Sequence, residues 1–168
     1  AKESSEELRH MGVTAVAQVR DVMTGLRRPT SDLPLSVAVV HLATLWQQRH
    51  ERAVELSVEE IDTSDETVRY ELLAICEEAL DNVAKYAGPC RVRVSLRADG
   101  DELVLAVEDF GKGSDQARMA AAGGAGHHGV TGMHERMARI GGLCTWISRL
   151  GEGTQVECRV HRSGLVER

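Results

Sequence analysis

Polar side chains recur at helical spacing between residues 78 and 86. Glu78 and Asn82 are four residues apart and Lys85 follows three residues later, with Tyr86 beside it, so these residues share one face of a helix. An amide oxygen together with water and phosphate oxygens suits Mg²⁺, which takes few protein ligands. A lysine one turn further on can meet a phosphate as a point charge. A solvated helix face with ordinary charge pairs has the same pattern, and this helix taken alone favours that interpretation.

A carboxylate and two glycines follow the alternating residues Leu103, Leu105 and Val107, in the sequence DFGKG at residues 109–113. A carboxylate at the end of a strand can accept a hydrogen bond from an exocyclic amine such as that of adenine. Glycines let the backbone approach a flat ligand without interference from a Cβ. By itself, the pattern is also that of a turn ending a strand.

Residues 123–133 (GGAGHHGVTGM) lead into a helix. Free N–H groups at a helix start, with glycine giving close access, predict an anion site suited to phosphates. A flexible loop with a glycine-rich cap is the alternative. The histidines of this region have no Cys or carboxylate spacing that supports a metal cluster, so we expect an exposed histidine pair, His127 and His128, in a mobile loop.

The composition excludes several classes of protein. The 168 residues predict one compact domain with an appendage, and the net charge of −6 argues against a nucleic-acid binder that works through bulk positive charge. No apolar run approaches the roughly 18 residues of a membrane span, so we expect no direct membrane contact and a cytoplasmic location. The four scattered cysteines indicate reduced, mostly buried thiols.

Helical periodicity predicts four helices that position these residues. The first covers residues 4–27, with one apolar stripe of the coiled-coil or bundle type. The second runs from Ser31 or Asp32 to about Arg49. The third opens at a capping box in residues 63–66 (TSDE) and runs from about Asp65 to Ala87, and the fourth runs from about Gly129 to Ile140.

Alternating segments predict the strands. One covers residues 53–61, and two hairpins follow, with turns at Asp99-Gly100 and at residues 151–153. The order of elements predicts an α+β fold, a two-layer sandwich with helices on one face of a mixed, mostly antiparallel sheet.

In combination, these motifs resemble the ATP-binding domain shared by gyrase, heat-shock chaperone, histidine kinase and mismatch-repair ATPases, the Bergerat-type fold. Residues 78–87 (EALDNVAKYA) resemble its N box, residues 109–113 its first glycine box, residues 129–136 (GVTGMHER) its second, and residues 151–154 (GEGT) the closing one. The G-x-x-G-M-x-E-R form is most similar to nitrate-sensor-type bacterial histidine kinases, which pair with LuxR-like response regulators. The resemblance covers about residues 33–162.

The resemblance implies a site for ATP and Mg²⁺. It assigns Asn82 to the metal and Glu78 to its water shell, as the two catalytic residues. Lys85 and Tyr86 would face the nucleotide phosphates or ribose, and Asp109 would bind the adenine amine. Phosphoryl transfer needs little covalent help from the protein, so positioning and charge neutralisation would carry catalysis.

Further residues are assigned to the nucleotide by the same resemblance. The glycines of the first box would shape the adenine pocket, those of the second would cradle phosphates, and the threonine of the last would support the adenine end. Together with the residues between them, these are Gly111, Gly113, Gly129, Val130, Gly132, Met133 and Thr154. The segment between the two glycine boxes would be a lid that orders over nucleotide.

The chain departs from the family pattern at two positions. Phe110 stands where the family usually has Asn, and we expect it to line the adenine pocket or to pack against the lid. His127 stands where the second box usually starts with Gly. Neither is among the residues assigned to Mg²⁺, and we expect ATP binding to survive both.

The domain organisation expected from this resemblance has three parts. Residues 1–28 would be the second helix of a dimerisation bundle, residues 29–162 the catalytic domain, and residues 163–168 a tail. His10 is followed by Met-Gly and is a poor match to a phosphoacceptor, so we expect a catalytic fragment that does not phosphorylate itself. Its partners would be dimerisation helices, its own or supplied in trans, and a LuxR-type regulator, with a homodimer possible in the full-length protein, itself membrane-anchored or a soluble sensor.

Two other functions are compatible with the sequence. An anti-sigma-factor-type serine kinase resembles this fold closely, although the helix at residues 4–27 and the G-M-x-E-R box speak against it. A degenerate module that binds nucleotide, or nothing, and acts through its helical surface is the other, supported only by Phe110 and His127.

Overall fold

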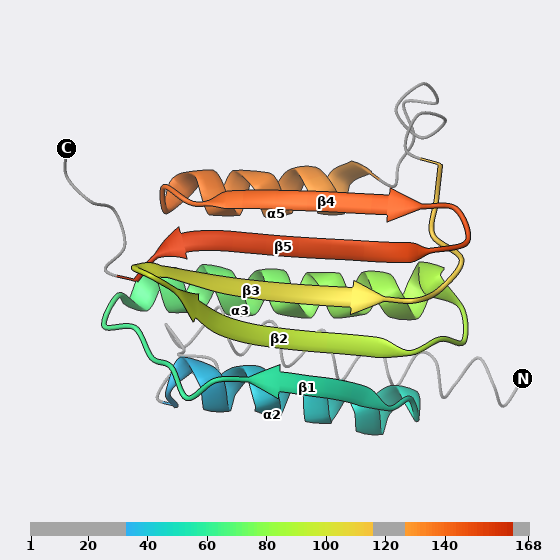
Figure 1. Cartoon of the computed structure of the whole chain (residues 1–168), viewed down its shortest axis with the longest axis horizontal. Helices are drawn as coiled ribbons and strands as arrows, with labels where there is room; N and C mark the ends of the chain where they lie inside the picture. The colour runs from blue at the N-terminus through green and yellow to red at the C-terminus, as the bar shows by residue number, and fades with distance from the viewer. Residues whose placement is uncertain (1–32, 116–126, 163–168) are drawn as a thin grey trace, which may run out of the picture. The chain divides into compact units, whose positions relative to one another are not determined.

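The computed structural model describes residues 33–115 and 127–162, and the predicted helix at 4–27, most of the lid and the tail lie outside these residues. Five strands form one sheet in the order β1-β2-β3-β5-β4 (Figure 1). Only β1 and β2 are parallel, and the other neighbours are antiparallel. The strands are β1 (Val54–Val58), β2 (Val92–Asp99), β3 (Glu102–Asp109), β4 (Leu143–Arg149) and β5 (Gly153–His161).

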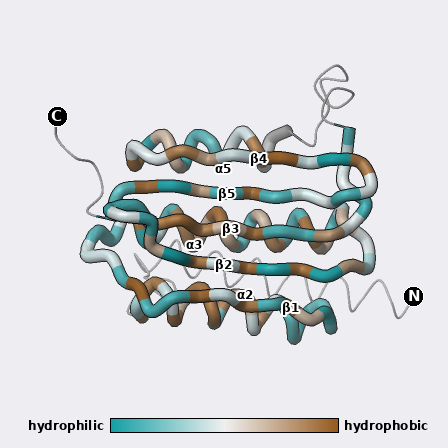
Figure 2. Tube along the Cα trace, in the orientation of Figure 1, coloured by the Kyte–Doolittle hydropathy of each residue, from teal (hydrophilic) through white to brown (hydrophobic). Residues whose placement is uncertain are grey.

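Three helices cover one face of this sheet, as predicted (Figure 1). They are α2 (Leu35–His50), α3 (Glu66–Asn82), which continues as a π-helical turn η1 (Val83–Ala87), and α5 (His127–Arg139). In β2, which alternates along its length (Figure 2), Val92, Val94 and Leu96 are fully buried toward the helices. The period of two places these apolar side chains on one face and leaves arginines and serine on the other. The core therefore lies between the sheet and the helix layer.

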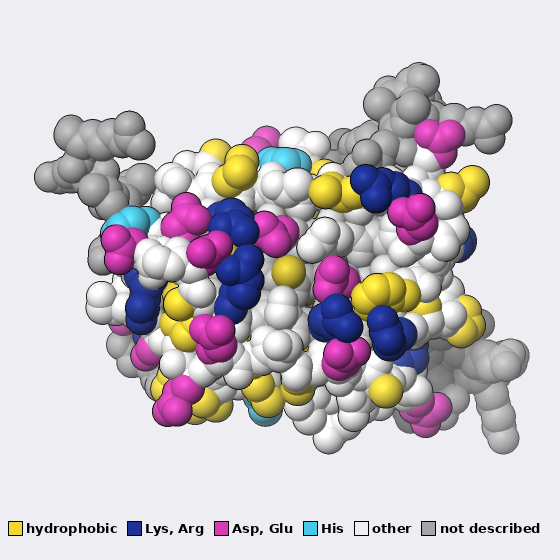
Figure 3. Space-filling view, in the orientation of Figure 1, with side chains coloured by type: hydrophobic (Ala, Val, Ile, Leu, Met, Phe, Trp, Pro, Cys, Tyr) yellow, Lys and Arg dark blue, Asp and Glu magenta, His cyan; other side chains and the backbone are white. Residues whose placement is uncertain are grey.

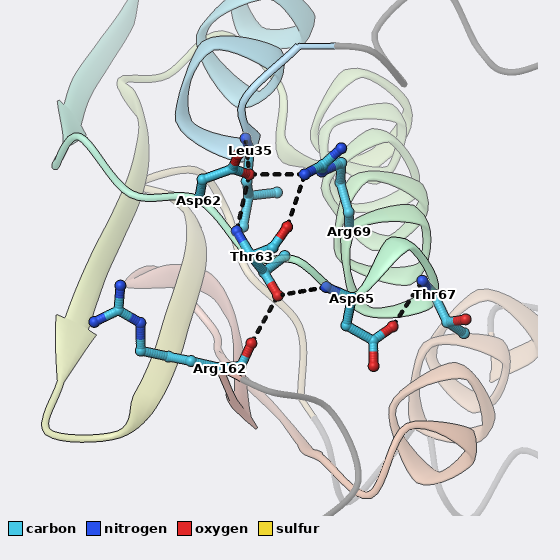
Figure 4. Close-up of polar contacts among 7 residues, drawn as sticks. All are labelled: Leu35, Asp62, Thr63, Asp65, Thr67, Arg69 and Arg162. Atoms are coloured by element: carbon cyan, nitrogen blue, oxygen red, sulfur yellow. Dashed lines mark hydrogen bonds and ion pairs between the residues drawn. The ribbon is translucent and has the colours of Figure 1, made fainter.

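The N-cap of α3 lies two residues later than the predicted capping box places it. The Asp65 carboxylate accepts hydrogen bonds from the backbone N–H groups of Thr67 (2.8 Å) and Val68 (3.1 Å), so Asp65 is the N-cap. The prediction that Thr63 caps the helix in a capping box is wrong. The Thr63 hydroxyl instead accepts from the Asp65 N–H and donates to the Arg162 carbonyl (Figure 4).

The end of this helix also differs in kind from the prediction. The helical run extends to Ala87, as expected, but its last five residues form a π turn rather than α-helix. Gly88 then adopts φ of +73°, a left-handed conformation that favours glycine, and ends the run. A π turn inserts one residue into the helical repeat, so it changes the directions in which Lys85 and Tyr86 point from those of a regular helix.

Both predicted hairpins are confirmed. The first has the two-residue loop Gly100-Asp101, because Asp99 pairs with Glu102, and Gly100 takes φ of +61°. The second has the loop 150–152, because Arg149 pairs with Gly153. The second hairpin places the Gly153–Thr154 end of β5 beside the Asp109 end of β3.

The other face of the sheet carries charged side chains that pair across strands. Arg93 lies 3.2 Å from Glu55 on β1 and 3.5 Å from Glu108 on β3. Arg159 on β5 contacts Asp99 and Glu157 at 2.9 Å each. Figure 3 shows positive and negative side chains interleaved on the face that no described helix covers.

The cysteines are free thiols: Cys76, Cys144 and Cys158 are buried and Cys90 is half-buried. Burial raises the pKa of Cys76 to about 12, so this thiol is unreactive at neutral pH. Among the described helices, none is long and apolar enough to cross a membrane.

Candidate nucleotide site

A cavity of about 250 Å³ lies between the C-terminal end of α3, the π turn, the start of α5 and the inner face of the sheet. Much of its wall is apolar, with polar groups at defined positions. The lining residues are Ala79, Asn82, Val83, Tyr86, Ala87, Val107, Asp109, Lys112, Gly113, Ser114, Val130, Trp146, Thr154 and Val156. Six predicted site residues are among them, drawn from four separate motifs.

Asp109 places a buried carboxylate at the end of β3. Its side chain accepts a hydrogen bond from the Gly111 N–H at 3.0 Å, and the residue is only 7% exposed. Burial raises the pKa of Asp109 above its ordinary value, although the backbone N–H groups of Gly111 and Thr154 and the charge of Arg52 oppose that shift. These contacts leave acceptor capacity on the carboxylate, so the cavity offers a strong acceptor in a largely apolar wall.

The sequence predicts that the glycines of the first box allow a flat ligand to approach the backbone, but the structure gives another reason for glycine at both positions. A Cβ on Gly111 would lie 2.3 Å from the Ala87 carbonyl oxygen, and one on Gly113, where φ is +59°, would lie 1.9 Å from the Arg149 carbonyl oxygen. Both glycines are therefore required by backbone packing within the protein. Gly113 also lines the cavity, whereas Gly111 does not.

A group of hydroxyls that the sequence did not single out supports the far end of the cavity. The Ser148 side chain lies 2.8 Å from the Thr154 hydroxyl and accepts from the backbone N–H and the hydroxyl of Ser114 at 2.9 and 3.0 Å. Ser148 is only 3% exposed. Only the cross-strand pairing of residues 148 and 154 brings these groups together, so no local motif could have identified Ser148.

The polar end of α3 meets the start of α5. A Cβ built on Gly129 would lie 2.7 Å from Glu78 Oε1 and 3.5 Å from Asn82 Nδ2. The fold therefore brings the predicted metal residues and the first glycine of the predicted phosphate helix together. Only glycine fits at this contact without displacing the Glu78 carboxylate.

The donors present there fit Mg²⁺. Glu78 and Asn82 supply one carboxylate and one amide oxygen at the rim of the cavity, and Mg²⁺ typically keeps waters and substrate phosphates as its other ligands. In residues 33–115 and 127–162, no three His, Cys, Asp or Glu side chains converge on a preformed metal site. A cation at Asn82 would thus bind together with an anionic ligand rather than alone.

The remaining predicted residues lie at different depths. Tyr86 and Val130 line the cavity, whereas the exposed Lys85 does not. A Cβ on Gly132 would meet nothing within 4 Å. Met133 is 1% exposed, belongs to the hydrophobic core and does not line the cavity.

The expectation that Phe110 lines the adenine pocket is wrong, and the alternative that it packs against the lid concerns residues 116–126, which lie outside the described part of the chain. Its ring does not line the cavity but lies on the open face of the sheet, 41% exposed, with the Arg91 guanidinium 4.3 Å and that of Arg93 5.5 Å from the ring centroid. Successive residues of a strand point to opposite faces, so the residue after the inward-facing Asp109 points outward. Phe110 therefore gives no reason to expect an impaired cavity.

Comparison with known proteins identifies the protein family to which this fold and site belong. The model of the family described as Histidine kinase-, DNA gyrase B-, and HSP90-like ATPase matches residues 67–164, more than half of the chain. The chain belongs to this ATPase family. The matched range contains every predicted site residue, from Glu78 to Thr154.

The curated relatives of this ATPase domain include histidine kinases. Sensor histidine kinase LiaS of Bacillus subtilis (strain 168) is 30% identical over 152 residues, which are 90% of this chain and 41% of LiaS. The signal transduction histidine-protein kinase/phosphatase UhpB of Salmonella typhimurium is 27% identical over 147 residues, 86% of this chain and 28% of UhpB. The chain thus spans less than half the length of these relatives, and its resemblance to them is that of an ATP-binding histidine kinase domain.

Solved structures confirm the fold of the ATPase domain. The blue-light activated histidine kinase of Erythrobacter litoralis EL346 superposes with a TM-score of 0.65 at 20% identity, over 77% of this chain and 42% of that one. The mycobacterial sensor histidine kinase MprB gives a TM-score of 0.63 at 16% identity, over 79% of this chain and 99% of that one.

Proposed function

We propose that this chain is the catalytic domain of a sensor histidine kinase of the nitrate-sensor type. It transfers the γ-phosphoryl group of Mg-ATP to a histidine on a dimerisation helix, for relay to an aspartate of a LuxR-type response regulator. The observation that carries the proposal is the cavity that has the buried Asp109 carboxylate in its wall and Asn82 at its rim. The similarity to LiaS and UhpB supports the histidine as acceptor.

The apolar part of the cavity binds the adenine. Ala87, Val107 and Val156 are apolar lining residues, and a flat base buries its faces against such side chains. Asp109 accepts a hydrogen bond from the exocyclic amine, which selects adenine over a base with a carbonyl at that position. Thr154, held by the Ser148 hydroxyl, supports the same end.

The rim of the cavity binds the phosphates. Gly129 and Val130 belong to the first turn of α5, where free backbone N–H groups favour an anion. Asn82 would hold Mg²⁺ with Glu78 ordering its waters, and the ion would neutralise charge on the β- and γ-phosphates. Tyr86 lies at the ribose or phosphates, and Lys85, exposed on the adjoining turn, reaches the phosphates from solvent. The protein's own part in catalysis is to align the γ-phosphoryl group with a nucleophile supplied by the partner helix.

Binding of nucleotide tests the first half of this proposal. We expect Mg²⁺-dependent ATP binding in the wild type and a loss of affinity in Asn82→Ala, measured by isothermal titration calorimetry with and without EDTA. Gln48→Ala, an exposed amide on α2, is the matched control and should bind as the wild type does. Equal affinities of Asn82→Ala and the wild type, or no binding by either, would favour a degenerate binding module.

Phosphoryl transfer tests the second half. A dimerisation helix that carries the acceptor histidine is supplied in trans with radiolabelled Mg-ATP, and we expect an acid-labile phosphoramidate on that helix. An acid-stable phosphoserine on a partner would instead identify a serine kinase of the anti-sigma-factor type. If ATP binds tightly but no histidine is labelled, the assignment as a histidine kinase is contradicted and the assignment of the nucleotide site is not.

A further inference from the structure

An ion pair between the buried Glu71 carboxylate and the partly exposed Arg136 joins α3 and α5 away from the nucleotide cavity. The Arg136 guanidinium donates to Glu71 Oε2 at 2.8 Å, and Arg139 approaches the other carboxylate oxygen at 3.7 Å. The Glu71 side chain is only 6% exposed. Neither Glu71 nor Arg136 lines the cavity, and the proposed function gives no role to either.

The ion pair and the contact at the cavity rim are separated by the same number of residues on both helices. Glu71 and Glu78 are seven residues apart on α3, and Gly129 and Arg136 are seven residues apart on α5. Since Glu71 meets Arg136 and Glu78 meets Gly129, the two helices run antiparallel and touch at two matched points. Seven residues of α-helix span about 10 Å, so the ion pair lies two turns from the rim.

The apolar contacts between these two points define the register of α5 weakly. Met133, between the two contact points, and Met137, one residue beyond Arg136, are both buried in the core. Methionine is unbranched and adapts to irregular gaps, so a methionine-rich contact tolerates sliding and rotation of the helix. A directional ion pair with a buried carboxylate does not, and fixing register is a well-attested role of buried polar groups.

We infer that Glu71 and Arg136 are positioning residues that set the register of α5 along α3 and so hold the start of α5 at the phosphate end of the cavity. The inference rests on the proposed function, because it concerns the nucleotide phosphates. At the rim the α5 backbone lies close to the Glu78 carboxylate, because a Cβ built on Gly129 would overlap it. A shift of α5 therefore changes the distance from its first N–H groups to the phosphates and leaves Asp109 in place on β3.

The experiment compares a ligand with phosphates and one without. Dissociation constants of Mg-ADP and of adenosine are measured for the wild type, Arg136→Met and Arg136→Lys by calorimetry, at a temperature at which each is folded by circular dichroism. We expect Arg136→Met to weaken Mg-ADP by about fivefold or more and to leave adenosine unchanged. Arg136→Lys, which retains a charged donor to Glu71, should restore part of the affinity for Mg-ADP.

Arg159→Met is the matched control, because it removes another multiply paired arginine, on the open face of the sheet. It should change the melting temperature little, because exposed ion pairs contribute little each, and it should leave both dissociation constants unchanged. If Arg136→Met does not fold, Glu71→Gln, which leaves no buried charge, gives the same comparison of the two ligands.

Two results would overturn the inference: unchanged Mg-ADP affinity in Arg136→Met and Glu71→Gln, or an equal loss for Mg-ADP and adenosine. The first leaves the proposed function intact and reduces the ion pair to a structural one. Failure of the wild type to bind Mg-ADP would instead contradict the proposed function itself.

Discussion

The Asp109 carboxylate is costly to the fold in the absence of a ligand. Burial raises its pKa above the usual value for an aspartic acid, so the folded chain holds this proton more tightly than the unfolded chain. By linkage, its contribution to stability falls as the pH rises through that range and is unfavourable at neutral pH. A residue that costs stability and faces a cavity is characteristic of function rather than of packing.

Asp109→Asn should therefore separate stability from binding. Asparagine keeps an oxygen for the Gly111 and Thr154 N–H groups but carries no charge, so we expect the free energy of unfolding of the ligand-free protein at pH 7 to be unchanged or higher. ATP affinity should fall, and more than that of a purine nucleotide without the exocyclic amine. Urea unfolding and calorimetry measure the two effects. Equal losses for both nucleotides would contradict the adenine assignment.

A pair of glycines distinguishes backbone strain from steric overlap. Gly113 and Gly151 both have positive φ, +59° and +81°, but a Cβ at Gly113 overlaps the Arg149 carbonyl whereas one at Gly151 meets nothing within 4 Å. We expect Gly151→Ala to cost about 1 kcal/mol in the free energy of unfolding and Gly113→Ala about 3 kcal/mol or more. Chemical denaturation measures both, and similar costs would show that the loop at Gly113 relaxes.

At the scale of elements, α3 is defined by its two ends. It begins where Asp65 caps the first turn and ends in a π turn whose Ala87 carbonyl accepts from the Lys112 N–H at 3.2 Å. That bond joins the helix to the first glycine box. The irregular end of the helix and the turn after β3 thus form one wall of the cavity.

The cap at the other end of α3 gives a prediction specific to one residue. Asp65→Ala should lower the free energy of unfolding by about 1 kcal/mol, because the Thr67 and Val68 N–H groups lose their acceptor. Ser64→Ala, at the exposed preceding residue, should change it by less than about 0.5 kcal/mol. Urea unfolding of both variants measures the two costs, and the reverse order would contradict Asp65 as the N-cap.

The elements could be predicted from the sequence because their signals are local. Alternation of apolar and polar residues identifies β2 and β3, and the apolar residues at helical spacing identify α2, α3 and α5. The predicted bounds of these elements agree with the observed ones within a few residues. The site was predicted less completely. The π turn, the Ser148 hydroxyl and the Glu71–Arg136 pair depend on contacts between distant segments, whereas the outward direction of Phe110 follows from the local alternation that turns Asp109 inward.

At the scale of the molecule, the two faces of the sheet have different roles. The helix layer and the inner face of the sheet enclose the cavity, while the outer face carries ion pairs exposed to water. Surface pairs of this kind contribute little each, so most of the stability comes from the core between the layers. The cavity is continuous with that core, because Val107 and Val156 belong to both.

A ligand in the cavity should therefore stabilise the whole domain. At a free Mg-ATP concentration about one hundred times its dissociation constant, we expect about 2.7 kcal/mol of added stability. Thermal unfolding with Mg-ATP, with EDTA added, and with adenosine alone measures this. The shift should shrink on chelation of the metal and be smaller for adenosine, and an equal shift with and without EDTA would contradict the metal assignment.

The two tryptophans give the protein a built-in optical reporter. Trp146 is half-buried and lines the cavity, whereas Trp46 is 4% exposed on α2 and does not. An adenine ring entering beside Trp146 should alter its emission while that of Trp46 stays constant. Nucleotide binding to the unlabelled protein can then be followed by intrinsic fluorescence, with the contribution of Trp46 serving as an internal standard.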